Sequence, residues 1–108
     1  MKKGEIWIID IPGLGGHEQR GRRPAIILAD TVTSIAIIIP CTSNIQALRF
    51  PFTLRVNASK SNGLEAHTIA LVLQLRAIDK KRLVKKIGVL EQSHLKEINR
   101  MIKQFLGL

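Results

Sequence analysis

Short apolar runs, rich in isoleucine and other β-branched residues, fill the first two-thirds of the chain and are separated by glycine, proline and asparagine. Runs of this kind, bounded by such breakers, are typical of strands. Two runs are almost continuously apolar, which indicates strands buried on both faces, and one alternates, which indicates a half-buried strand. We expect strands at Glu5–Ile11, Pro24–Ala29, Ser34–Ile39, Phe50–Val56 and Thr68–Leu75.

The periodicity changes in the last third of the chain. Apolar residues recur at helical spacing from Leu95 to Phe105, and Gly107 follows where a helix should end. A short helical turn is expected at Asp79–Leu83, with Asp79 as its N-cap. Neither a repeat nor a linker interrupts the sequence. The pattern therefore predicts a single domain over residues 1–108, mainly β with a C-terminal helix (α+β). We expect a small, mostly antiparallel β-barrel with the helix packed on it.

Composition adds a strong positive charge to this picture. Among 108 residues, 17 Lys and Arg stand against 8 Asp and Glu, which gives a net charge of +9. A folded domain this basic is expected to meet a polyanion. The apolar runs are far shorter than the ~20 residues that span a bilayer, and the residues after Met1 do not resemble a signal peptide. We therefore expect a cytoplasmic protein that does not enter a membrane. Cys41 is the only cysteine, which excludes an internal disulfide and a cysteine-based zinc site.

Arginines gather at the end of a glycine-rich segment, residues 13–22. Arg20, Arg22 and Arg23 lie at the entrance of the second predicted strand. Loops held by a rigid scaffold often carry function, and the planar guanidinium matches a phosphate in two-point contact. This cluster is the better candidate for an anion site, whereas the basic run Arg76–Lys86 is typical of a solvated surface.

Other chemistry-bearing residues are scattered. His17, His67 and His94 are far apart and the acids are dispersed, so we expect no metal site and no cofactor. His17 could act as a base in RNA cleavage or be an exposed loop residue. Residues 42–44, Thr-Ser-Asn, could bind a phosphate at the end of the third strand or form an ordinary turn. Cys41 has no evident base partner and is expected to be buried.

Four motifs in order resemble one known family. They are KGEIW at residues 3–7, GHEQRGRRP at 16–24, IPCTS at 39–43 and QLRAIDKKRL at 74–83. Together with the C-terminal helix they cover nearly the whole chain. The sequence resembles the MazF/PemK-type toxins of toxin–antitoxin systems, which are sequence-specific endoribonucleases also called mRNA interferases.

The resemblance implies a barrel of the SH3-like, plasmid-maintenance-toxin type that acts as a homodimer. Such a toxin would cleave single-stranded RNA at a short motif without metal, arrest growth, and be blocked by a cognate antitoxin with an acidic disordered tail. The family's catalytic pair maps onto Arg23 and Thr42. The residues expected to contact RNA are Glu18, Gln19, Arg22, Ser43, Gln74 and Arg76.

Some assignments stay open at the level of sequence. Arg23 is better suited to charge stabilisation or acid catalysis than to base catalysis, because arginine is always protonated. The general base is therefore unassigned. A role for Arg22 or His17 in catalysis is also open. The segments Gly13–Gly16 and Asn44–Phe50 are candidates for shaping the cleavage motif. Two other functions suit the same type of barrel, a gyrase-poisoning toxin and a non-catalytic RNA-binding module, and loss of activity in Arg23→Ala would separate them from the nuclease.

Overall fold

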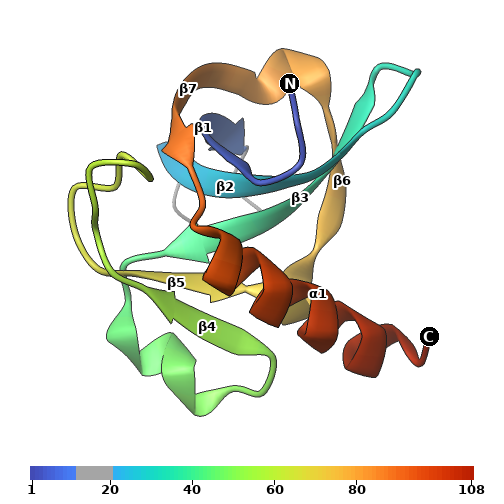
Figure 1. Ribbon diagram of the computed structural model, residues 1–108. Coiled ribbons are helices and arrows are strands. Elements are labelled where there is room, and N and C mark those ends of the chain that lie inside the picture. Colours follow the sequence, from blue (N-terminus) through green and yellow to red (C-terminus); the bar gives the residue numbers. More distant parts are fainter. Residues whose placement is uncertain (12–20) are drawn as a thin grey trace.

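The computed structural model describes residues 1–11 and 21–108, which form one curved sheet, one α-helix and three short 3-10 turns (Figure 1). The strands are β1 (Glu5–Ile11), β2 (Gly21–Asp30), β3 (Ile35–Thr42), β4 (Thr53–Val56), β5 (Thr68–Leu71), β6 (Arg76–Asp79) and β7 (Leu83–Val89). The 3-10 turns are η1 (Ile45–Arg49), η2 (Val72–Gln74) and η3 (Lys80–Arg82). The helix α1 spans Gln92–Leu106.

The sheet is antiparallel at every pairing that the described residues show, and its strand order is β4-β5-β3-β2-β1-β7. β3 is the centre of the fold. It pairs with β2 along one edge, and along the other edge it pairs with β5 at its C-terminal end and with β6 at its N-terminal end. Over the described residues the sheet curves without closing, so the mainly β class with one C-terminal helix is confirmed and the shape is barrel-like.

Both faces of the central strands are buried. Ile26 of β2 and Ile39 of β3 belong to a core cluster that also contains Ile98 of α1. Their neighbours Ile27 and Ile38 belong to a second cluster on the opposite face. This alternation confirms the prediction that these two apolar runs are strands buried on both sides.

Helix α1 packs across one face of the sheet through Ile98, which is fully buried. It ends where the sequence predicts, because Gly107 takes a left-handed conformation (φ 70°) that glycine adopts without a steric penalty. The amide of Leu108 then donates to the carbonyl of Lys103 and closes the last turn. The expected turn near Asp79 is also present, since the Asp79 side chain accepts a hydrogen bond from the Lys81 amide and caps η3.

Two expected strands are shorter than the apolar pattern indicates. β4 begins at Thr53 rather than Phe50, because Phe52 has a positive φ (56°) that breaks the extended backbone. β5 ends at Leu71 rather than Leu75, because η2 interrupts the run before β6 begins. The hydrophobic pattern continues through each break, and this is why sequence alone does not reveal them.

Two strands, β6 and β7, are absent from the sequence prediction. Both begin within the basic run Arg76–Lys86, whose composition is typical of a solvated surface. β7 pairs with β1, and Lys86 forms an ion pair with Glu5 at 3.2 Å. Lys80, between the two strands, forms an ion pair with Asp30 at 2.6 Å. The backbone of the basic run therefore belongs largely to the sheet, while most of its charged side chains remain exposed.

The segment between β4 and β5 is fixed by a buried asparagine. The Asn62 side chain accepts hydrogen bonds from the amides of Ser59 and Leu64 and donates to the carboxylate of Glu91. A Cβ atom added to Gly88 would stand 2.3 Å from the Asn62 carbonyl carbon, so the segment and β7 are in direct backbone contact. This contact sets the distance between the segment and the sheet.

None of the described helices has the length and apolar character needed to cross a membrane.

Candidate functional site

Arg23 of β2 and Thr42 of β3 each lie two residues beyond the last residue pair of these two strands. The pairing of the two strands ends at Ala25↔Pro40, and the same register continued by two residues brings Arg23 opposite Thr42. Because side chains alternate along a strand, both project from the face that carries Ala25 and Pro40. A guanidinium and a hydroxyl, both half-buried, therefore lie on the same face of the sheet, near the end of the β2–β3 pairing.

The hydroxyl of Thr42 has a defined orientation. Its Oγ1 accepts a hydrogen bond from the amide of Asn44 at 3.2 Å. A hydroxyl that accepts in this way still has its own proton to donate. Thr42 can therefore donate to a phosphate oxygen while the turn after β3 holds it in place. Ser43, the next residue, is exposed.

Arg76 and Gln74 lie toward the same end of the same face. Arg76 of β6 pairs with Ile38 of β3, so it shares the face of Ile38 and Pro40 and is half-buried. Gln74, the last residue of η2, is exposed two positions before it. Arg76 also lines a cavity of about 230 Å³ together with Ile11, Ile78 and Arg82. Arg82 is not a candidate from sequence reasoning.

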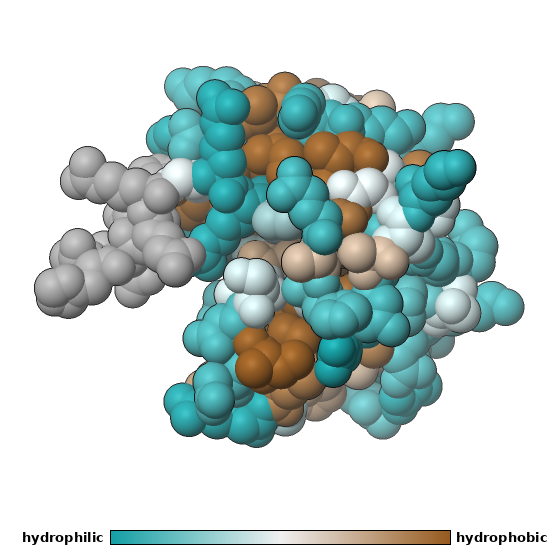
Figure 2. All heavy atoms as spheres, turned by 90° about the vertical axis from the view of Figure 1, so that its left-hand side faces the viewer, coloured by the Kyte–Doolittle hydropathy of each residue, from teal (hydrophilic) through white to brown (hydrophobic). Residues whose placement is uncertain are grey.

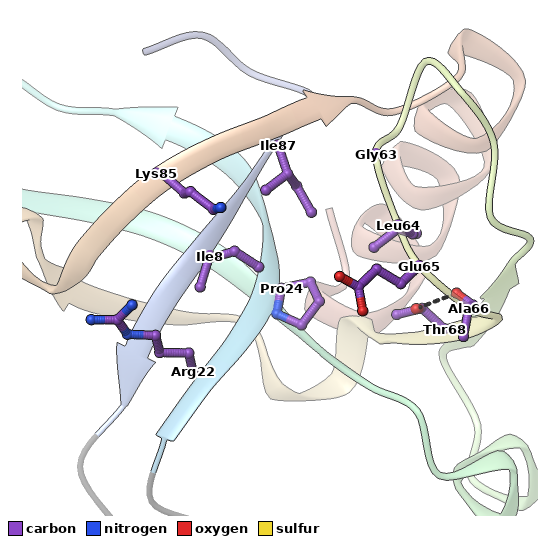
Figure 3. Close-up of a pocket in the computed structure, with 10 residues that line it drawn as sticks. All are labelled: Ile8, Arg22, Pro24, Gly63, Leu64, Glu65, Ala66, Thr68, Lys85 and Ile87. Carbon is purple, nitrogen blue, oxygen red and sulfur yellow. Dashed lines mark hydrogen bonds between the residues drawn. The ribbon is translucent and has the colours of Figure 1, made fainter.

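Arg22 lies on the other face of β2. It is exposed and lines a separate cavity of about 320 Å³, on the side of the sheet that carries Pro24 and Ile8 (Figure 3). The tandem arginines thus serve different surfaces. The remaining residues of this cavity come from the 63–68 segment and β7, and they are Gly63, Leu64, Glu65, Ala66, Thr68, Lys85 and Ile87.

This second cavity has an apolar floor and charged walls. In Figure 3 the Glu65 carboxylate and the Lys85 ammonium face it from opposite sides. Sequence reasoning missed both residues. Lys85 is hidden in the basic run, and Glu65 reaches the sheet only because Asn62 and Gly88 fix its segment there.

Three expected site residues, His17, Glu18 and Gln19, lie outside the described residues, as does the candidate specificity segment Gly13–Gly16. The second specificity segment, Asn44–Phe50, coincides with η1 and its flanking residues.

The surroundings shift the pKa of two residues, Cys41 and Glu5, in opposite directions. Burial raises the pKa of the Cys41 thiol to about 12, so Cys41 is a buried neutral residue as expected and is no nucleophile near pH 7. A hydrogen bond from the indole of Trp7 (2.9 Å), aided by Lys86, lowers the pKa of Glu5 to about 2. Glu5 is therefore a structural carboxylate that ties β1 to β7. Within residues 1–11 and 21–108, no three His, Cys, Asp or Glu side chains are grouped to hold a metal ion.

Comparison with known proteins identifies the family. Residues 2–106 match the model described as PemK-like, MazF-like toxin of type II toxin-antitoxin system. The chain is 30% identical to the endoribonuclease MazF of Staphylococcus saprophyticus, over 100% of this chain and 92% of that protein. It is 29% identical to the endoribonuclease EndoA of Bacillus subtilis, over 100% and 96%. A crystal structure of MazF from Deinococcus radiodurans superposes with a TM-score of 0.80 at 25% identity, covering 100% of this chain and 97% of that one. These matches favour the nuclease over the gyrase-poisoning alternative, and the chain belongs to the PemK-like, MazF-like family of toxins, the endoribonucleases of type II toxin–antitoxin systems.

Proposed function

We propose that this toxin cleaves single-stranded RNA at a short sequence motif, without a metal ion, with Arg23 and Thr42 as its catalytic residues. The observation that carries the proposal is the β2–β3 register, which supports a guanidinium and a hydroxyl side by side on one face. This pair is what an RNA phosphodiester needs when its own 2′-oxygen is the nucleophile.

The reaction is an internal displacement at phosphorus. The 2′-hydroxyl of the ribose attacks the adjacent phosphorus, its proton passes to a base, and the bond to the 5′-oxygen of the next nucleotide breaks. The products are a 2′,3′-cyclic phosphate and a 5′-hydroxyl that has gained a proton. The Arg23 guanidinium stabilises the negative charge that grows on the phosphate oxygens, and the Thr42 hydroxyl donates to one of them.

Positive charge beside this pair supports binding of the RNA backbone. Arg76 shares the face of Arg23 and Thr42, and we propose that it contacts RNA together with Gln74 and Ser43. Arg22 is proposed to bind a more distant part of the strand, because it lies on the opposite face of β2. Glu18 and Gln19 complete the proposed set by their motif positions.

We also propose that the toxin acts as a homodimer on mRNA in the cytoplasm, and that an antitoxin with an acidic disordered tail inhibits it. The net charge of +9 supports an acidic tail, because such a segment competes with RNA for the same cations. A titration of cleavage against a synthetic acidic tail tests this: inhibition should weaken as salt rises, and inhibition that is insensitive to salt would contradict it.

The test of the function is cleavage of a long single-stranded RNA in excess EDTA, with the cut ends mapped and their chemistry determined. We expect discrete cuts at one short motif that leave a 5′-hydroxyl. Arg23→Ala should lower the cleavage rate by about 10²–10³-fold, as removal of one oxyanion donor does. The matched control is Arg100→Ala, which removes an arginine of α1 that pairs with Glu97 and should retain activity. Cleavage that needs an added divalent ion, or that survives Arg23→Ala, would contradict the proposal.

A further inference from the structure

Three large apolar side chains are exposed on the 3-10 turn that follows β3. Ile45, Leu48 and Phe50 expose 48%, 39% and 47% of their surface. Figure 2, which views the side where η1 lies in Figure 1, shows apolar surface gathered low on this face among hydrophilic residues. Apolar clusters with a polar rim mark binding surfaces.

The turn is firmly held, so the exposure of Phe50 is not that of a frayed loop. Asn44 caps η1 by accepting from the Gln46 amide, and Ala47 packs on Ile69 and Leu71 of β5. The amide of Phe50 donates to the carbonyl of Ala47. The ring of Phe50 is therefore presented to solvent by a turn with its own small core.

Phe52 explains why Phe50 stays outside. Phe52 packs under α1, with its ring centroid 5.1 Å from that of Phe105, and it reaches this place through a positive φ (56°). That conformation is costly for an aromatic residue and is commonly found at functional sites. The inner position is thus occupied by Phe52 at a cost in strain, and Phe50 is left on the surface.

The exposed turn lies one strand away from Thr42. Ile69 of β5 is the direct partner of Thr42 in the β3–β5 pairing, and Ile69 is also the residue on which Ala47 of η1 packs. Residues opposed across a pair of strands project from the same face. The turn that carries Phe50 is therefore anchored on the face of the sheet from which Thr42 projects.

The surroundings of Phe50 are cationic. The Arg49 guanidinium lies over the ring, 5.0 Å from its centroid, and Arg55 of β4 pairs with the same Ile69. No acidic residue stands between Asp30 and Glu65 in the chain. An aromatic ring with an arginine over it, and further positive charge on the same sheet, is an arrangement with which proteins stack a base and hold the adjoining phosphates.

We propose that Phe50 and Arg49 form a stacking platform for one unpaired nucleobase of the RNA strand that the proposed catalytic pair cleaves. The inference rests on the proposed function, because it assigns the RNA strand to the face of Thr42. Stacking holds a base by its face and leaves its edge free, so the platform sets the position of the strand and contributes affinity with little sequence preference. Sequence specificity would then come from hydrogen bonds between polar groups and the free edge of the base.

The test measures RNA binding separately from cleavage. The probe is a short 2′-O-methylated RNA, which cannot be cut, with 2-aminopurine placed in turn at each position. Stacking on Phe50 should quench 2-aminopurine at one position and not at the others. Phe50→Ala should abolish that quenching and weaken binding by about 5- to 150-fold. Phe50→Trp should restore both, and Val32→Ala, which removes a fully exposed apolar side chain elsewhere, should change neither.

The salt dependence of RNA binding separates the contribution of the Phe50 ring from that of the Arg49 charge. Phe50→Ala should leave the slope of log affinity against log salt unchanged, since no charge is lost, whereas Arg49→Ala should reduce it by about 0.7. Unchanged affinity and quenching in a folded Phe50→Ala protein would overturn the platform even if the wild type cleaves RNA. A change in oligomeric mass in that variant, with RNA binding intact, would overturn it in favour of a protein contact. If the wild type does not cleave RNA, the proposed nuclease function is refuted. The binding measurements still test whether Phe50 stacks on a base.

Discussion

Arg22 and Arg23 are adjacent in the chain but lie on opposite faces of β2. Arg22 lines the cavity shared with Ile8 and Pro24, whereas Arg23 faces the side of Ala25, whose partner on β3 is Pro40. The strand alternation thus separates two residues that look equivalent in the sequence, and under the proposed function they contact different parts of the RNA.

Substitution of the two arginines should therefore change different kinetic constants. In Arg22→Ala the cleavage rate at saturating RNA should stay within about threefold of wild type while KM rises, because only uniform binding of the strand is lost. Steady-state cleavage at several RNA concentrations measures both quantities. A large loss of kcat in Arg22→Ala would show that this side of β2 also faces the reacting phosphate, and would contradict the assignment.

Gly88 should be intolerant of any side chain. Because a Cβ atom there would stand 2.3 Å from the backbone of Asn62, Gly88→Ala must push the 57–67 segment away from β7. We expect a loss of unfolding free energy of at least about 1–3 kcal/mol, typical of overpacking. Urea unfolding measures it. Val89→Ala changes the next, more exposed residue and should have a much smaller effect.

Glu5 should make stability depend on acid. Its folded pKa of about 2 lies below its ordinary value of 4.5, because Trp7 donates to it and Lys86 pairs with it. The stabilisation is therefore complete above pH 4.5 and is lost as pH falls toward 2. Glu5→Gln should cost about 1.5–3 kcal/mol near pH 7 and much less at low pH. Urea unfolding of both proteins at several pH values tests this, and parallel pH profiles would contradict it.

Cys41 should be chemically silent. It is buried, and burial raises its pKa to about 12, so the reactive thiolate is absent from the folded protein near pH 7. Iodoacetamide should label it only after unfolding, and treatment of the native protein should leave RNA cleavage unchanged. Rapid labelling of native protein with loss of cleavage would restore the thiol as a candidate nucleophile.

The sequence predicts an element correctly where a local residue pattern is sufficient to determine it. The run Glu5–Ile11 is a strand as predicted, and Asp79 and Gly107 are the predicted caps. β7 was missed because none of its residues is fully buried, two exposed lysines stand at its centre, and its pairing depends on β1, which is distant in the sequence. The predicted strand at Thr68–Leu75 ends early because β5 pairs only with the C-terminal end of β3. The N-terminal part of the same edge of β3 pairs with β6.

The candidate site was predictable as a set of residues but not as an arrangement. The family motifs single out Arg23 and Thr42, yet the face that they share depends on the register between β2 and β3, which shifts between Ile27 and Ala29. Likewise, the exposure of Phe50 follows from the backbone of Phe52, and an alternating apolar pattern gives no sign of a positive φ.

A double-mutant cycle on Arg23 and Thr42 tests the central claim most directly. Single-turnover cleavage of one mapped RNA site in EDTA would be measured for wild type, Arg23→Ala, Thr42→Ala and the double variant, each with its fold verified by circular dichroism. If the two residues act on the same phosphate, the double variant should be scarcely slower than the slower single variant, because residues that act as a unit are strongly non-additive. Rate losses that multiply would show that the two residues act independently and would contradict the shared site.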